Sequence, residues 1–280
     1  MTAPDPAALL GRLRDLPALP QALASLLEAL QREDVAIDDL AATLSQDQAL
    51  AAKTLRLANS SFYGLRGRVN SIRDAIGVLG LRSLSTALTA AAVSGCFAQP
   101  RCRGFDLAAY WRHSIACGLC ARHLARSLRL DDGTAFTAGL LHDLGRLTLA
   151  SLAPEWLEPV YDQRRQLDCT MLQAERDVLG TDHAELGAQV ARRWHFGNDV
   201  VEAIRLHHAP PAGATVSLTD LVHVADVFVH GLDLAGVPDE MVPPLAADAW
   251  GRVSLSEAEC ETVFERTEVE LEELCDALGV

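Results

Sequence analysis

Leucine and alanine recur every three or four positions through most of this chain of 280 residues. The stretch from Gln21 to Gln31 shows the pattern clearly, with leucines at positions 23, 26, 27 and 30. Both residue types favour helices, whereas the β-branched and aromatic residues that favour strands are sparse. Apolar residues at this spacing line one face of a helix. The sequence therefore predicts an all-α fold, with enough mass for a sizeable core.

Breaks rich in proline and glycine divide the chain into three parts. QPRCRGFD interrupts the helical pattern at 99–106, and GVPDEMVPPL interrupts it again at 236–245. We therefore predict an N-terminal helical subdomain over 1–100 and a second helical subdomain over 101–235. A linker and an acidic amphipathic C-terminal helix are expected over 236–280.

The acidic C-terminal helix carries half of the chain's net charge of −14, because Gly251 to Val280 hold nine carboxylates and two arginines. Its apolar residues nevertheless fall on one stripe, which predicts that one side is buried and the acidic side is exposed. Two alternatives stay open: the helix docks on its own chain, or on a second copy in a homodimer. The stripe consists of Phe264, Leu271, Leu274 and Leu278.

Composition and charge argue against several classes of protein. No basic run is present, so we expect no nucleic-acid partner, although AIGVLGLRSLSTAL loosely resembles a helix-turn-helix. The uncharged stretch from Ser83 to Pro100 is too weakly apolar for a membrane span, and we expect a buried helix there. Seven cysteines without a secretion signal predict reduced thiols and a cytoplasmic protein. Cys117 and Cys120 form a C-x-x-C, for which two small core residues are a better interpretation than a zinc or redox pair.

Histidines and aspartates occur in apolar, helix-like surroundings in the second part of the chain. This part holds all nine histidines. In AGLLHDLGRLTL, for example, a histidine and an aspartate lie side by side in an apolar run. Burying such a pair costs several kcal/mol unless its polar atoms are satisfied. Neutral imidazoles and carboxylates are ligands of divalent metal ions. The candidate metal ligands are His113, His142, Asp143, His183, His207, His208 and Asp226.

The surroundings of His183 show how one of these side chains would be presented. Asp182 and Glu185 form a helix-capping pattern, so His183 is expected to begin a helix. Gly187, one turn later, would let another helix approach closely, either to complete a site or simply to pack.

The order H, HD, H, HH, D resembles the HD superfamily of helical metal-dependent phosphohydrolases. More narrowly, the chain is similar to the HDOD family, the HD-related output domain of bacterial signalling, over about residues 15–226. The motifs that carry this resemblance are LPALP (16–20), LRLANSSFYG (55–64), SIRDAIGVLG (71–80), WRHS (111–114), AFTAGLLHDLGRL (135–147), DHAELGA (182–188) and HH (207–208).

The resemblance implies an all-α fold in which an N-terminal bundle packs on an HD-like bundle, and a role in signal output. The cofactor stays open between none and a divalent metal, with Fe, Mn, Ni, Zn and Mg as the alternatives; the resemblance to the phosphohydrolases favours the metal. One ion would be held by His113, His142, Asp143 and Asp226, and a second by His183, His207 and His208. Asp143 and Arg146 are the candidate catalytic residues.

The chain departs from the catalytic HD-GYP relatives in two places. After the double histidine it reads HHAPPAGATV and lacks their Gly-Tyr-Pro element. Arg146 stands where those enzymes carry a lysine; arginine cannot give up a proton at working pH, but it can clamp a phosphate. We therefore expect a regulatory output module that acts by binding signalling proteins or a nucleotide or cyclic-dinucleotide ligand, without catalysis. The alternative is a metal-dependent phosphohydrolase acting on such a ligand.

Overall fold

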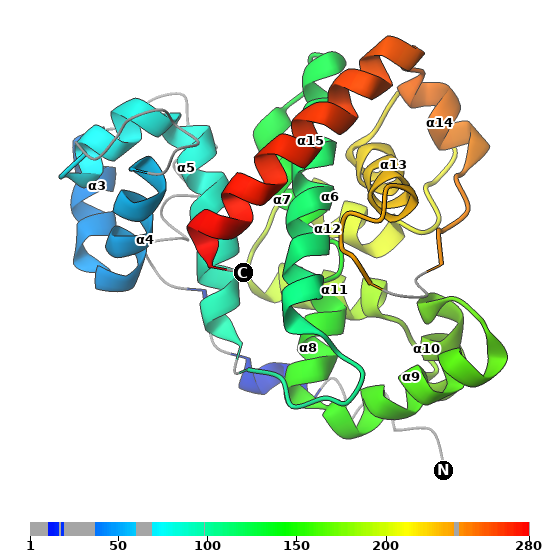
Figure 1. Ribbon diagram of the computed structural model, residues 1–280. Coiled ribbons are helices and arrows are strands. Elements are labelled where there is room, and N and C mark those ends of the chain that lie inside the picture. Colours follow the sequence, from blue (N-terminus) through cyan, green and yellow to red (C-terminus); the bar gives the residue numbers. More distant parts are fainter. Residues whose placement is uncertain are drawn as a thin grey trace. The chain divides into compact units, whose positions relative to one another are not determined.

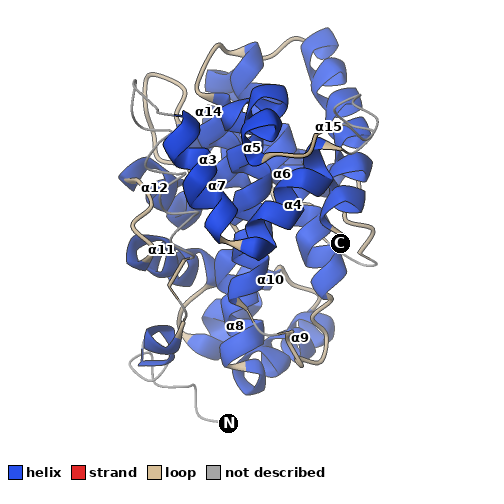
Figure 2. Ribbon diagram, turned by 90° about the vertical axis from the view of Figure 1, so that its left-hand side faces the viewer, coloured by secondary structure: helices blue, strands red, loops and turns tan. Residues whose placement is uncertain are grey.

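The computed structural model describes residues 11–16, 18–19, 37–59, 69–97, 99–237 and 241–279. Every regular element in these ranges is a helix (Figure 1), and Figure 2 shows helices joined by loops without a strand among them. The predicted all-α fold is confirmed. The helix expected from Gln21 to Gln31 and the end of the LRLANSSFYG motif lie outside the described residues.

The described residues divide into two compact units. The larger consists of those within 1–17 and 97–267, and the smaller of those within 18–96 and 268–280. The three-part division made from the sequence stays a prediction.

The smaller unit is built on three helices that pack against one another: α3 (Ile37–Gln46), α4 (Gln48–Ala58) and α5 (Ile72–Cys96). Leu44, Leu84 and Leu88 are buried at its core. The backbone of α5 leaves helical geometry at Gly80, where φ is 72°. Glycine adopts this left-handed conformation without the steric cost that a Cβ brings.

The larger unit is centred on α6 (Leu107–Ser127), which packs against α7 (Asp132–Leu141) and α13 (Leu218–Gly231) (Figure 1). Most of α6, from Ser114 to Ala125, is buried. The remaining helices are α8 (Leu144–Leu152), α9 (Pro154–Leu167), α10 (Met171–Leu179), α11 (His183–Arg193), α12 (Asn198–Leu206) and α14 (Ala247–Val253), with a 3-10 turn at Leu13–Asp15.

Side-chain caps fix where several of these helices begin. Asp106 accepts hydrogen bonds from the amides of Ala108 and Ala109 at the start of α6. Asp182 accepts one from the amide of Glu185, and α11 begins at His183, as its capping pattern predicts. Ser217 and Asp220 form a reciprocal capping box at the start of α13.

The last helix, α15 (Glu257–Leu278), is buried along part of its length. Leu271 and Leu274 of the predicted stripe are buried, and the half-buried Phe264 lies edge-on to Phe228 of α13, with ring centroids 4.9 Å apart. Which surface the whole helix docks on stays a prediction.

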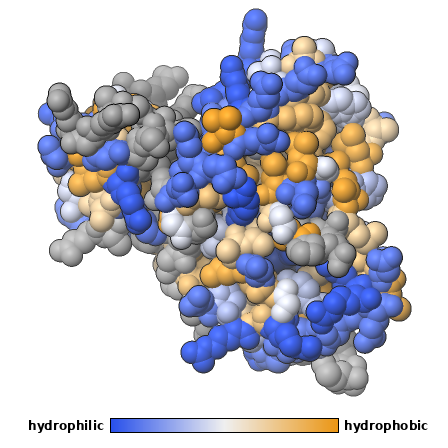
Figure 3. All heavy atoms as spheres, viewed as in Figure 1, coloured by the Kyte–Doolittle hydropathy of each residue, from blue (hydrophilic) through white to orange (hydrophobic). Residues whose placement is uncertain are grey.

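No helix in the described ranges is both long enough and apolar enough to cross a bilayer. Hydrophobic side chains do reach the surface around α13 and the chain that leads into α14 (Figure 3), where Met241, Val242 and Leu245 are exposed.

Helices α8 and α11 meet at a pair of glycines. A Cβ added at Gly145 would overlap the carbonyl of His183, and one added at Gly187 would lie 3.0 Å from the Gly145 amide nitrogen. The room predicted at Gly187 is therefore filled by the backbone of α8. This close approach brings the first turn of α11 against the turn that follows Asp143.

We expect Gly145→Ala to destabilise the protein by about 2 kcal/mol, the usual scale of overpacking. The matched control is Gly251→Ala in α14, where a Cβ meets nothing within 4 Å and alanine favours the helix. Urea unfolding followed by circular dichroism measures both free energies of unfolding. Equal stabilities for the two variants would contradict the tight packing of α8 on α11.

Candidate metal centre

His142 and Asp143 form the whole connection between two helices. Helix α7 ends at Leu141 and α8 begins at Leu144, so the pair occupies the elbow between them. Both side chains are buried, at 1% and 3% exposure. The adjacent polar pair noted in the sequence thus turns into the interior, where the elbow holds it against three other helices.

An inner group of side chains gathers around His142. Its Nε2 lies 3.2 Å from Nε2 of His113 on α6 and 3.5 Å from Oδ1 of Asp226 on α13. The His113 Nε2 is also 3.2 Å from the same Asp226 oxygen. The Nδ1 of His142 donates to the carbonyl of Gly139, so Nε2 is the ring nitrogen that faces the group.

An outer group consists of three histidines. His183 begins α11, and its Nε2 lies 2.8 Å from Nε2 of His208. His207 and His208 follow α12, and their ring centroids are 3.9 Å apart. The Nδ1 of His207 donates to the carbonyl of Ile204 at 2.7 Å, whereas its buried Nε2 has no hydrogen-bond partner. The lone pair of this nitrogen is therefore available to a metal ion.

Asp143 connects the two groups. Its Oδ1 lies 3.8 Å from Nε2 of His142 and 3.1 Å from Nε2 of His183. Its Oδ2 accepts a hydrogen bond of 2.8 Å from Nη1 of Arg146, one turn along α8. The structure thus brings all seven residues singled out in the sequence into one contiguous cluster, and their role as metal ligands stays a prediction.

Three residues of the cluster were not chosen from the sequence. Glu175 of α10 is buried, and its Oε2 is 2.5 Å from Nδ1 of His183. Cys117 and His230 each lie four positions from a chosen residue on the same helix, after His113 and Asp226 respectively. The helical spacing of four residues could have pointed to the last two. No sequence pattern pointed to Glu175, because its burial depends only on how α10 packs.

The charges of the two buried aspartates are stabilised by their neighbours. Burial opposes ionisation, but Arg146 and His142 hold the pKa of Asp143 well below its usual range. For Asp226, burial is likewise outweighed by hydrogen bonds from His113 and His142, so its pKa is also far below the usual range. Both carboxylates are therefore ionised and available as ligands.

Two histidines of the outer group, His207 and His183, differ in charge. Burial, with the nearby His142 and His183, lowers the pKa of His207 to about 3, so this ring is neutral. Burial also acts to lower the pKa of His183, but the carboxylates of Glu175 and Asp143 outweigh it and raise the pKa to about 9. In the protein without metal, His183 carries a proton that a bound cation would displace.

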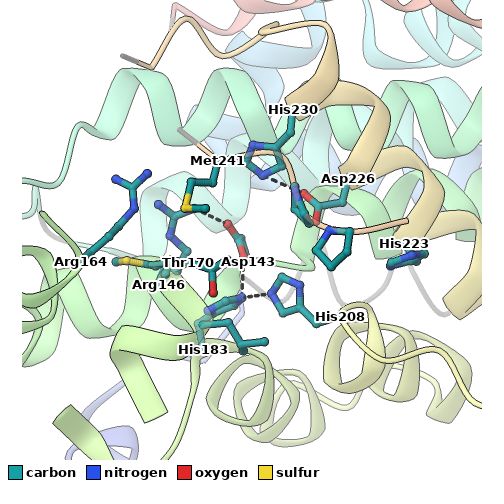
Figure 4. Close-up of a pocket in the computed structure, with 14 residues that line it drawn as sticks. Asp143, Arg146, Arg164, Thr170, His183, His208, His223, Asp226, His230 and Met241 are labelled. Atoms are coloured by element: carbon teal, nitrogen blue, oxygen red, sulfur yellow. Dashed lines mark hydrogen bonds and ion pairs between the residues drawn. The ribbon is translucent and has the colours of Figure 1, made fainter. Parts of the chain in front are cut away.

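A cavity of about 200 Å³ opens onto the cluster. In Figure 4, Asp143, His183 and His208 lie together at the cavity, and Asp226 pairs there with His230. Arg146 and Arg164 are also among the residues that line it. The cavity thus combines candidate metal ligands with cationic side chains that suit a phosphate.

The donor set fits divalent metal ions. Imidazole nitrogens and carboxylate oxygens are common ligands of Zn, Fe, Mn and Ni, and the orphaned Nε2 of His207 shows that protein groups alone do not satisfy the cluster. The Glu175 carboxylate on Nδ1 of His183 has the form of the outer-shell partner that orients a metal-bound histidine. The buried cluster could therefore hold a metal.

Comparison with known proteins places the chain in a family. Residues 16–210 match the HDOD domain. The chain belongs to the HDOD family. An HDOD domain protein from Geobacter sulfurreducens is 26% identical, with 96% of this chain and 99% of that chain covered at a TM-score of 0.78. A candidate phosphohydrolase from Shewanella amazonensis SB2B is 28% identical, with 98% and 97% covered at a TM-score of 0.75.

A longer relative shares most of this sequence. An uncharacterised protein of Treponema pallidum (strain Nichols) is 30% identical over 250 residues, which is 85% of this chain and 46% of that protein. The HDOD chain thus spans about half the length of this relative. The family resemblance noted in the sequence is confirmed.

We expect Glu175→Gln to weaken binding of Zn²⁺ or Mn²⁺ by about 10- to 100-fold, the usual cost of losing an outer-shell partner. The isosteric amide keeps the volume but removes the charge that stabilises the His183 imidazole. Asp177→Asn, on the exposed face of the same helix, is the matched control. Isothermal titration gives both affinities; equal values would show that Glu175 does not support a metal ligand.

The raised pKa of His183 predicts how stability changes with pH in the protein without metal. Its folded pKa of about 9 lies above the ordinary value of 6.5, so folding favours the protonated ring. This contribution is fully present below pH 6.5 and is lost as the pH rises through about 9. Urea unfolding across this range measures it, and Glu175→Gln should flatten the dependence. A stability that rises over the same window would contradict the assignment.

Proposed function

We propose that this HDOD protein binds a divalent metal centre in its larger unit and uses it to hydrolyse a small phosphorylated ligand. The observation that carries the proposal is the buried Nε2 of His207, which faces the cluster without a partner. Most buried polar side-chain atoms have a hydrogen-bond partner, so a lone pair that faces a group of metal-ligand side chains supports a bound ion. The candidate phosphohydrolase from Shewanella, similar over nearly the whole chain, supports the same function.

His183, His207 and His208 would hold the ion nearest the cavity, with Asp143 between this group and the inner one. The metal would supply a nucleophilic water at neutral pH and neutralise charge on the phosphoryl oxygens. Arg146, anchored on Asp143, and Arg164 line the same cavity and would bind those oxygens. The charge of Arg146 is permanent, so it positions the phosphate and does not transfer a proton.

A second candidate function is regulation by binding without turnover, the interpretation that the sequence favoured. It is supported by HHAPPAGATV, where no Gly-Tyr-Pro element follows the double histidine. It is also supported by the exposed apolar side chains at Met241, Val242 and Leu245, beside the cavity mouth. In this case the ligand-bound site would signal to a partner protein through that surface. In this second function, the protein would act by binding signalling proteins or by forming a homodimer.

Hydrolysis of bis(p-nitrophenyl) phosphate by the Mn²⁺-loaded full chain separates the two functions. We expect multiple turnovers. His207→Ala should lower the rate by at least about 100-fold, because losing a direct ligand costs at least as much as losing an outer-shell partner. His195→Asn is the control, because His195 is exposed and asparagine tolerates its left-handed backbone at φ 60°. Stoichiometric metal without turnover would favour regulation. Absence of bound metal would contradict hydrolysis and, together with a captured partner protein, would also favour regulation.

We further expect no substantial turnover of cyclic di-GMP. A cavity of about 200 Å³ is smaller than the pockets of roughly 300–1,000 Å³ that enclose drug-sized ligands, and no Gly-Tyr-Pro loop is present to position a second nucleotide. Poor orientation alone lowers rates by orders of magnitude. Chromatography of linear and mononucleotide products measures the reaction. Multiple turnovers that vanish in both His142→Ala and Asp143→Ala would overturn this prediction.

A further inference from the structure

Cys117 faces the inner group of the cluster. It lies on α6 one turn after His113, is fully buried, and its Sγ is 3.5 Å from Nε2 of His113. Its neighbour in the C-x-x-C motif, Cys120, is hydrogen-bonded with Thr267, and burial raises the pKa of that thiol to about 12. The two cysteines therefore have different surroundings: Cys117 contacts His113, whereas Cys120 contacts Thr267.

The distances among the inner group resemble those between the ligands of one ion. Ligand atoms on a tetrahedral zinc, bound at about 2.0–2.3 Å, are separated by roughly 3.3–3.8 Å. Around His113 Nε2 the separations are 3.2 Å to His142 Nε2, 3.2 Å to Asp226 Oδ1 and 3.5 Å to Cys117 Sγ. His142 Nε2 and Asp226 Oδ1 are 3.5 Å apart, and all four atoms lie within 4.8 Å of one another.

Asp143 fits this inner group less well than Cys117 does. Its Oδ1 is 3.8 Å from His142 Nε2 but only 3.1 Å from His183 Nε2, on the side of the outer group. Its other oxygen is held by Arg146. The thiol thus occupies the fourth corner that the resemblance assigned to Asp143.

We propose that the thiolate of Cys117 completes a closed zinc site with His113, His142 and Asp226. The inference rests on the proposed metal centre and adds its inner ligand and its metal preference. On binding, the S–H bond breaks, a sulfur–zinc bond forms, and the proton leaves to the solvent. Four protein ligands leave no open position, as in structural zinc sites, whereas the outer group offers three histidines beside the cavity, as in catalytic ones.

A thiolate ligand also selects the ion. Soft sulfur donors favour Zn²⁺ and Co²⁺ over Mg²⁺, which prefers oxygen ligands. The inner site should therefore retain Zn²⁺ in the presence of excess Mg²⁺, while the outer site, built without sulfur, exchanges its ion more readily.

X-ray absorption on the Zn²⁺-loaded full chain tests the inner site without any substitution. We expect a sulfur shell at about 2.3 Å together with nitrogen and oxygen ligands at about 2.0–2.2 Å. The sulfur shell should persist in His207→Ala, which removes an outer ligand only. Bound zinc surrounded by nitrogen and oxygen alone would overturn the thiolate ligand but leave the proposed metal centre intact. Absence of bound zinc would overturn both.

The Co²⁺-loaded protein gives an independent readout. A cobalt–thiolate bond produces a near-ultraviolet charge-transfer band, which we expect in the wild type. The matched control is Cys120→Ser, which changes another buried cysteine of the same helix and should keep the band. The band should be lost in Cys117→Ser and in Cys117→Ala, each of which changes little volume. A band that survives in a folded Cys117 variant would exclude Cys117 as the ligand.

Discussion

Two ionised carboxylates inside a helical core are the constraint on which the larger unit depends. Asp143 and Asp226 are almost completely buried, and an unpaired charge there would cost several kcal/mol. Their partners come from α6, the elbow between α7 and α8, and α13, so these elements must meet around the carboxylates. The glycine contact between α8 and α11 then brings His183 to Asp143 from the other side.

The same contacts link stability to metal binding. Without an ion, buried imidazoles and a guanidinium neutralise the carboxylates, and His183 holds an extra proton through Glu175. A bound cation would take over that neutralising role, displace the proton and stabilise the folded state in proportion to its affinity. The hydrogen-bonded core network and the proposed metal centre would therefore be two states of one cluster. In the proposed metal centre, an ion would also bind the buried Nε2 of His207, which has no hydrogen-bond partner in the protein.

The cluster has a closed side and an open side. The inner group, with Cys117, is surrounded by buried helix faces of α6 and α13, whereas His183 and His208 line the cavity beside Arg146 and Arg164. An ion held deep in the core would fix the positions of the helices, and one at the cavity would meet the ligand. In the proposed function, this division would combine a stable scaffold with a site for a phosphorylated ligand.

The sequence alone determined the helical class, the family and seven of the residues of the cluster, because helical periodicity and chemically unusual residues in apolar surroundings are local properties. It also predicted that His183 begins a helix, since a capping pattern lies within four residues. Only the tertiary structure decided that Glu175 is buried and that Asp143 turns towards His183, because both depend on which helix faces pack together. For Cys117 the two contributions differ: its place four residues after His113 already puts both side chains on one face of α6. Only the packing of α6 against α13 and the elbow brings Asp226 and His142 to that face, because these contacts join residues that are far apart in the sequence.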